Sequence, residues 1–93
     1  MKSTAVIWTE PVREKLRSFR SEHFTVEETF DYVAQLILET EDLLLNPILS
    51  RSYTEDFGKF KGFSRVVVKK FRIYFQVIEQ DIVITAILFP GEQ

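Results

Sequence analysis

The sequence contains no cysteine, which excludes disulfide bonds, thiolate catalysis and cysteine-ligated metals. A chain that needs no oxidising compartment is expected in the cytoplasm. No apolar run is long enough to span a membrane, and the opening residues lack the apolar core of a signal peptide. The one histidine, His23, precedes a helix-capping signal, where a surface role is expected. Without a histidine pair or a carboxylate cluster, no metal or cofactor is expected.

Charge is unevenly distributed along a chain that is expected to form a single domain over residues 1–93. The net charge is −2, yet seven basic and only two acidic residues lie between Arg51 and Arg72. Seven acidic residues and no lysine or arginine lie between Glu22 and Asp42. Two interpretations stay open. In the first, the acidic helix and the basic strands each simply face solvent. In the second, the basic residues form a patch for phosphate whose charge is cancelled in the net charge by the acidic helix.

Two helical segments follow a short β-prone run from Thr4 to Trp8. The first helix is predicted to start after Thr9, which has the chemistry of an N-cap, and to end near Arg20 to Glu22. The second begins at the capping box Thr25-Val-Glu-Glu28 and ends at Asn46-Pro47. Its apolar face is expected to contain Phe30, Val33, Leu36, Ile37, Leu43 and Leu44.

The last third of the chain has the pattern of three strands. Alternation from Phe71 to Val77 predicts a strand with one buried face, and the apolar run Ile82 to Phe89 predicts a central strand covered on both faces. Val66 to Val68 marks the strand before them, whereas Ile48 to Lys61 has no period and is predicted as a loop. The fold class is α+β, ordered β-α-α-β-β-β, with a largely antiparallel four-stranded sheet and a helical hairpin on one face.

Three short motifs carry a family resemblance: Gly62-Phe-Ser-Arg65, then Phe71-Arg72-Ile-Tyr-Phe-Gln-Val, and Val6-Ile-Trp-Thr9 as a first strand. Together with the order of elements they resemble the RelE/ParE superfamily of bacterial toxins, over nearly the whole chain. The resemblance implies a RelE/ParE-like fold and the toxin of a type II toxin–antitoxin pair, with a cognate antitoxin as protein partner. One branch of the family cleaves mRNA in the ribosomal A site, and the other poisons DNA gyrase without catalysis.

The resemblance also assigns candidate catalytic residues. Arg72 matches the arginine that stabilises the scissile phosphate in the ribonuclease branch, and Arg65 falls near the basic residues of the preceding strand. Tyr74 shares a strand face with Arg72, where it is a candidate acid or a stacking platform. The alternatives are a surface ion pair between Arg72 and the acidic helix, and an exposed strand tyrosine. The residues expected to position RNA are Lys59, Lys61, Lys69 and Lys70.

The chemistry implied for that branch needs no metal. A 2′-hydroxyl attacks the adjacent phosphorus, a base and an acid move the protons, and cations stabilise the charged phosphorane. Arginine suits the last role because its guanidinium forks onto phosphate oxygens.

The sequence departs from the family pattern between Ala86 and Gln93, where no histidine, tyrosine or arginine is available as acid, base or cation. The basic tail of many ParE-like members is missing too. Three hypotheses follow: a ribosome-dependent endoribonuclease acting on mRNA, a non-enzymatic gyrase poison, or a relative that binds antitoxin and has lost activity. The first is preferred because the spacing of Gly62-Phe-Ser-Arg65 and Phe71-Arg72 is closer to the ribonuclease members. None of the three needs a membrane.

Overall fold

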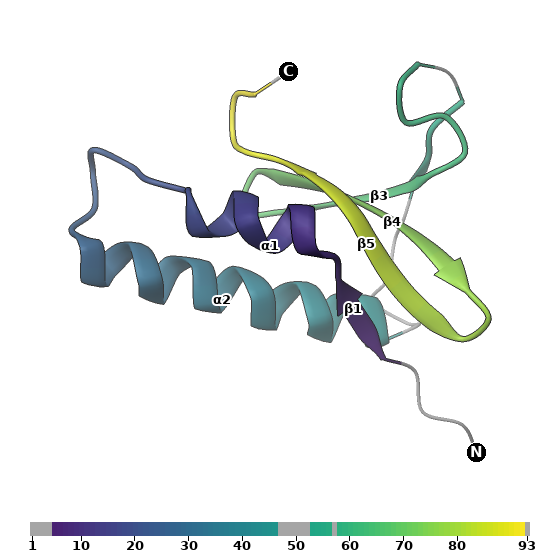
Figure 1. Ribbon diagram of the computed structural model, residues 1–93, viewed down its shortest axis with the longest axis horizontal. Helices are drawn as coiled ribbons and strands as arrows, with labels where there is room; N and C mark the ends of the chain where they lie inside the picture. Colours follow the sequence, from purple (N-terminus) through teal and green to yellow (C-terminus); the bar gives the residue numbers. More distant parts are fainter. Residues whose placement is uncertain (1–4, 47–52, 57, 93) are drawn as a thin grey trace.

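The computed structural model describes residues 5–46, 53–56 and 58–92. Two helices lie side by side against one face of a twisted sheet (Figure 1), so the predicted α+β class and helical hairpin are confirmed. The elements in chain order are β1 (Val6–Trp8), α1 (Glu10–Arg17), α2 (Val26–Leu45), β2 (Tyr53–Thr54), β3 (Ser64–Val68), β4 (Phe71–Ile78) and β5 (Asp81–Leu88).

The strands form one sheet in the order β1-β5-β4-β3-β2. The predicted antiparallel meander of β3, β4 and β5 is confirmed. The sheet is nevertheless mixed, because β1 joins it beside β5 and runs parallel to that strand. The two-residue β2 lies within the segment predicted as a loop and pairs Tyr53 with Arg65. A strand this short carries no periodic signal that sequence analysis can detect.

Helix α1 is attached to the sheet through Thr9, the residue that precedes it. Thr9 is at the predicted N-cap position, but its hydroxyl donates to the Ile84 carbonyl of β5 over 2.8 Å and does not cap the helix. The helix ends at Arg17, earlier than predicted, because the amides of Ser18 and Phe19 bond to carbonyls three residues back. This tighter last turn brings Phe19 into the core.

Helix α2 begins with the predicted capping box: the Glu28 amide donates to the Thr25 hydroxyl over 3.1 Å, and the Glu28 carboxylate accepts from the Thr25 amide over 2.8 Å. The expectation that Phe30 belongs to the buried face is wrong, since 71% of this residue is exposed. Helix α1 has eight residues and α2 has twenty, so α1 does not extend far enough to cover the start of α2 (Figure 1).

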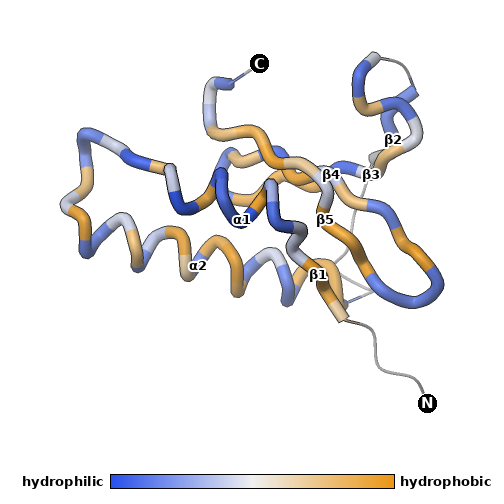
Figure 2. Tube along the Cα trace, viewed as in Figure 1, coloured by the Kyte–Doolittle hydropathy of each residue, from blue (hydrophilic) through white to orange (hydrophobic). Residues whose placement is uncertain are grey.

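The core lies between the helices and one face of the sheet. Figure 2 shows hydrophobic residues along the strands and recurring along α2. The buried apolar side chains of this core are Val12, Leu16, Phe19, Leu36, Leu44, Val66, Val68, Phe71, Ile73, Phe75, Ile82, Ile84 and Ile87.

A β-bulge lets β5 keep its apolar side chains against the helices. The register between β4 and β5 shifts at Tyr74/Phe75, which leaves Thr85 as an extra residue. Ile84 and Ile87 are three positions apart and would face opposite sides of a regular strand, yet both are buried in the core. The predicted central position of β5 is confirmed, because β1 and β4 pair with its two edges.

Strand β4 follows its predicted alternation in part. Phe71, Ile73 and Phe75 are buried, but Val77 is 64% exposed because this end of the β4–β5 hairpin extends past the helices (Figure 1). Tyr74, expected on the polar face, is buried as well, because Phe60 covers it on the side of the sheet that is turned away from the helices.

The β3–β4 turn has a backbone that its sequence does not favour. Lys69 and Lys70 have φ values of +50° and +69°, the left-handed region that a two-residue type I′ hairpin turn requires at both positions. Asn-Gly is the usual pair there, and other L-residues are strained by about 1–2 kcal/mol. Lys69 is held by an ion pair with Glu39 of α2 at 3.3 Å and lies 5.1 Å from the Tyr32 ring centroid. Lys70 is exposed.

We predict that Lys70→Gly raises the free energy of unfolding by about 1 kcal/mol, because glycine adopts a positive φ without steric cost. Urea denaturation measures the change. Lys70→Ala is the matched control, since it removes the same charge but keeps the Cβ atom. Equal stabilisation by the two variants would attribute the effect to charge and contradict the backbone explanation.

Candidate functional site

The strand register brings the candidate catalytic residues onto one side of the sheet. Arg65 pairs with Tyr74, and Val67 pairs with Arg72. Directly paired residues, and residues two apart along a strand, share a face, so Arg65, Arg72 and Tyr74 all lie on the face turned away from the helices. We call this side the outer face; it is formed by Arg65, Val67, Arg72, Tyr74, Ala86 and Leu88.

Tyr74 is covered on the outer face. Its ring stacks on Phe60 with centroids 4.0 Å apart and an interplanar angle of 12°, and only 3% of the residue is exposed. Phe60 in turn contacts Phe63 edge-to-face at 6.4 Å. Phe60 therefore occupies the position that a stacked nucleobase would take, and the alternative of an exposed strand tyrosine is wrong.

Arg65 holds the segment that carries Phe60. Its guanidinium forms an ion pair with the Glu55 carboxylate at 3.3 Å, and the two side chains are 31% and 17% exposed. The Glu55 amide donates to the Phe63 carbonyl, and the Gly62 amide donates to the Glu55 carbonyl, each over 3.0 Å. These bonds hold the segment around Glu55 and Phe63 against β3, so Arg65 has a structural role through its ion pair with Glu55.

Arg72 lies beside a second cation that the sequence patterns did not single out. Its guanidinium donates to the Glu92 carbonyl. Lys15 of α1 donates to the Glu92 carboxylate over 2.7 Å and to the Ile87 carbonyl over 2.7 Å. The Phe89 amide also donates to the Glu92 carboxylate over 2.8 Å. Arg72 and Lys15 therefore both bind Glu92 after the end of β5. None of the interactions of the described Arg72 side chain is the anticipated ion pair with the acidic helix.

The hydrogen bond from Lys15, followed by that from the Phe89 amide, lowers the pKa of the Glu92 carboxyl below its usual range, and the charge of Arg72 adds a smaller contribution. Residues 86–93 thus contain one ionisable side chain at this position, the Glu92 carboxylate, although no histidine, tyrosine or arginine is present. A depressed pKa stabilises the folded state above the ordinary glutamate pKa, and this contribution is lost as the pH falls through the lowered value.

The four lysines expected to position RNA are divided between two places. Lys59 and Lys61 are exposed in the loop that covers the outer face, and the Lys59 ammonium lies 5.6 Å from the Phe60 ring centroid. Lys69 and Lys70 form the β3–β4 turn, where Lys69 is directed toward α2 by Glu39. The structure therefore leaves Lys59, Lys61 and Lys70 accessible and engages Lys69 in the fold.

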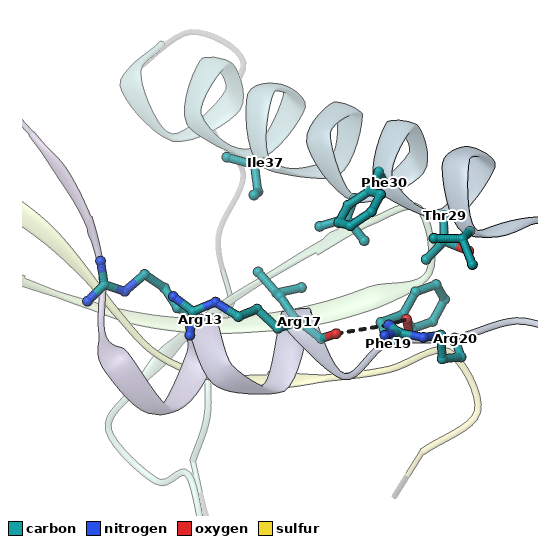
Figure 3. Close-up of a pocket in the computed structure, with 10 residues that line it drawn as sticks. Arg13, Arg17, Phe19, Arg20, Thr29, Phe30 and Ile37 are labelled. Atoms are coloured by element: carbon teal, nitrogen blue, oxygen red, sulfur yellow. Dashed lines mark hydrogen bonds between the residues drawn. The ribbon is translucent and has the colours of Figure 1, made fainter.

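An apolar groove separates α1 from α2 and has a volume of about 260 Å³. Figure 3 shows Phe30 and Ile37 reaching from α2 toward α1, with Arg13, Arg17 and Arg20 on the opposite side. The groove is lined by Arg13, Leu16, Arg17, Phe19, Arg20, Val26, Thr29, Phe30, Val33 and Ile37. Exposed apolar side chains beside three arginines have the composition of a docking site for a protein segment.

The three arginines differ in how they are held. Arg13 and Arg17 form ion pairs with Glu10 and Glu14 of the same helix. The Arg20 guanidinium donates to the Arg17 carbonyl over 2.9 Å and to the Phe19 carbonyl over 2.7 Å. No acidic side chain lines the groove, but Glu10 and Glu14 offset the charges of Arg13 and Arg17, so the excess positive charge at the rim comes from Arg20.

In the described part of the chain, no group of three or more histidine, aspartate or glutamate side chains is arranged to hold a metal ion. None of the helices described has the length and apolar character needed to cross a bilayer. No family model matches the chain, and neither the curated proteins nor the solved structures contain a significant match.

We predict that Arg65→Met lowers the free energy of unfolding by about 1–3 kcal/mol, because it leaves the mostly buried Glu55 carboxylate without its cation. The double variant Arg65→Met, Glu55→Gln is expected to recover most of this loss, as judged by chemical denaturation. If the double variant is as unstable as the single one, the ion pair does not hold the loop.

Proposed function

We propose that this protein is a toxin-type endoribonuclease that inhibits translation by cleaving mRNA on the ribosome, in the cytoplasm, with a RelE/ParE-like fold. The observation that carries the proposal is the convergence of Arg65, Arg72 and Lys15 around the outer face and its edge, in a chain whose net charge is negative. The motifs around Arg65 and Arg72 that resemble the RelE/ParE toxins support the same function.

The reaction follows from the side chains at this place. The 2′-oxygen attacks the adjacent phosphorus, and the bond to the 5′-oxygen breaks, which gives a 2′,3′-cyclic phosphate and a 5′-hydroxyl end. Arg72 supplies the fork of N–H donors for the equatorial oxygens of the phosphorane. Lys15 carries a proton that it can give to the leaving 5′-oxygen, and the 2′-hydroxyl proton passes to water. Lys59 and Lys61 contact the RNA backbone beside the site.

Two alternatives lead to different results in the cell. A gyrase poison uses the same basic surface to bind a protein, without cutting RNA. An inactive relative keeps the fold and the partner contact only, and the engagement of Arg72 by the chain's own carbonyl is the observation in its favour.

We predict that induced expression arrests bacterial growth with cleaved mRNA, and that Arg72→Ala lowers cleavage about 10²–10³-fold by removing a donor to the transition state. Primer extension on mRNA from arrested cells, with analysis of the cleaved ends, measures the effect. Arg72→Lys is the matched control because it keeps the charge and loses the fork, and an intermediate rate is expected. Growth arrest with intact mRNA and inhibited supercoiling would instead identify a gyrase poison. Normal growth would identify an inactive relative.

We further propose that the partner is an antitoxin whose acidic, amphipathic segment docks in the groove between α1 and α2. Val26 and Phe30, 64% and 71% exposed, supply the apolar contact, and the arginines of the rim complement acidic side chains on the partner.

We predict that Phe30→Ser weakens neutralisation by the proposed antitoxin by at least tenfold, without unfolding the chain, because Phe30 contributes little to the core. Co-expression growth assays and a binding titration test this. Leu38→Ser is the control, since Leu38 is 56% exposed on the same helix and does not line the groove. Equal neutralisation of both variants would place the partner elsewhere.

A further inference from the structure

Glu92 is held by three donors that come from separate parts of the fold. Its carboxylate oxygen Oε1 accepts from the Lys15 ammonium at 2.7 Å and from the Phe89 amide at 2.8 Å. Its main-chain carbonyl accepts from the Arg72 guanidinium. An ammonium, a guanidinium and a backbone N–H, which here all donate to one residue, are donor types that proteins use for phosphate.

We propose that Lys15, Arg72 and the Phe89 amide form a phosphate-binding site that Glu92 fills in place of the ligand. The carboxylate stands in for one phosphate oxygen and the Glu92 carbonyl for a second. Because Glu92 brings only a single formal charge to two cations, a phosphate group with more oxygens and equal or greater charge satisfies more of the N–H donors.

The turn that carries Glu92 begins at Phe89, which packs against the core, whereas its next two residues lie at the surface. The Glu92 amide donates to the Phe89 carbonyl over 2.9 Å across a four-residue turn. Proline at its second position and Gly91 at its third, with φ of +81°, are the signature of a type II turn. Pro90 and Gly91 are exposed, and the Lys15 and Glu92 side chains are 31% and 38% exposed, so solvent and small anions reach the ion pair.

Glu92 is better suited to occupy the site than to act as a catalytic base. Its Oε1 atom already accepts two hydrogen bonds, and the ion pair with Lys15 makes the carboxylate a weaker base than an ordinary glutamate. If the proposed function holds, on which this role for Arg72 rests, Glu92 competes with the scissile phosphate and the turn acts as an internal inhibitor.

The competition is expected to be modest. Ion pairs that are partly open to solvent contribute little, so removing Glu92 should tighten phosphate binding by about three- to tenfold. The apparent affinity of a site is its intrinsic affinity multiplied by the fraction of molecules in which the site is free. Glu92→Ala raises that fraction toward one.

The test measures inorganic phosphate binding to the whole chain by NMR titration, with the Phe89 amide as the reporter at the site. Glu92→Ala is expected to lower the phosphate Kd about three- to tenfold, and the second substitutions Lys15→Met or Arg72→Met in that background are expected to abolish the gain. Glu22→Ala is the control, because it removes one exposed negative charge from the link between the helices. Equal Kd values for wild type, Glu92→Ala and Glu22→Ala, or a gain that survives loss of Lys15 and Arg72, would overturn the proposal.

RNA cleavage separates this proposal from the function it rests on. Tighter phosphate binding by Glu92→Ala without any mRNA cleavage would keep the site and reject the endoribonuclease. Cleavage by the wild type with no change in phosphate Kd on Glu92→Ala would keep the endoribonuclease and reject the site. Loss of cleavage in Glu92→Gln with an unchanged phosphate Kd would make Glu92 the general base and would also reject internal inhibition.

Discussion

The central position of β5 is the constraint on which the rest of the structure depends. This strand pairs with β1 and β4 and gives the core the side chains of Ile82, Ile84 and Ile87. The short β1 covers only part of one β5 edge, and α1 lies along the next part. Lys15 bonds to the Ile87 carbonyl there, so the arrangement that completes the core also brings a cation from the first helix beside Arg72.

Local chemistry made the helix starts and the meander predictable from sequence. The capping box at Thr25 and the alternation around Ile73 are signals that residues a few positions apart create together. The parallel pairing of β1, the short β2 and the exposure of Phe30 depend on segments far apart in the chain or on the length of a neighbour. Such features have no local signal.

The candidate site likewise combines residues that local sequence patterns predict with residues whose positions depend on distant parts of the chain. Strand periodicity was sufficient to expect Tyr74 on the same strand face as Arg72, and the register of β3 with β4 adds Arg65 to that face. Lys15 was visible only as one of several polar residues of an amphipathic helix, and its role needed the position of α1 beside β5. The burial of Tyr74 needed the fold of a segment without period, which brings Phe60 onto its ring.

The pairing of β1 with β5 also determines when the sheet is completed during synthesis. Val6 pairs with Ile82, so the first strand stays without its neighbour until nearly the whole described chain has left the ribosome. Pairings across such long loops form late because the entropy of closing the loop must be offset first. The positions of Lys15 and Arg72 around Glu92 depend on the same event. The contacts of Lys15 and Arg72 with Glu92 are therefore complete only after the residues of β5 are available.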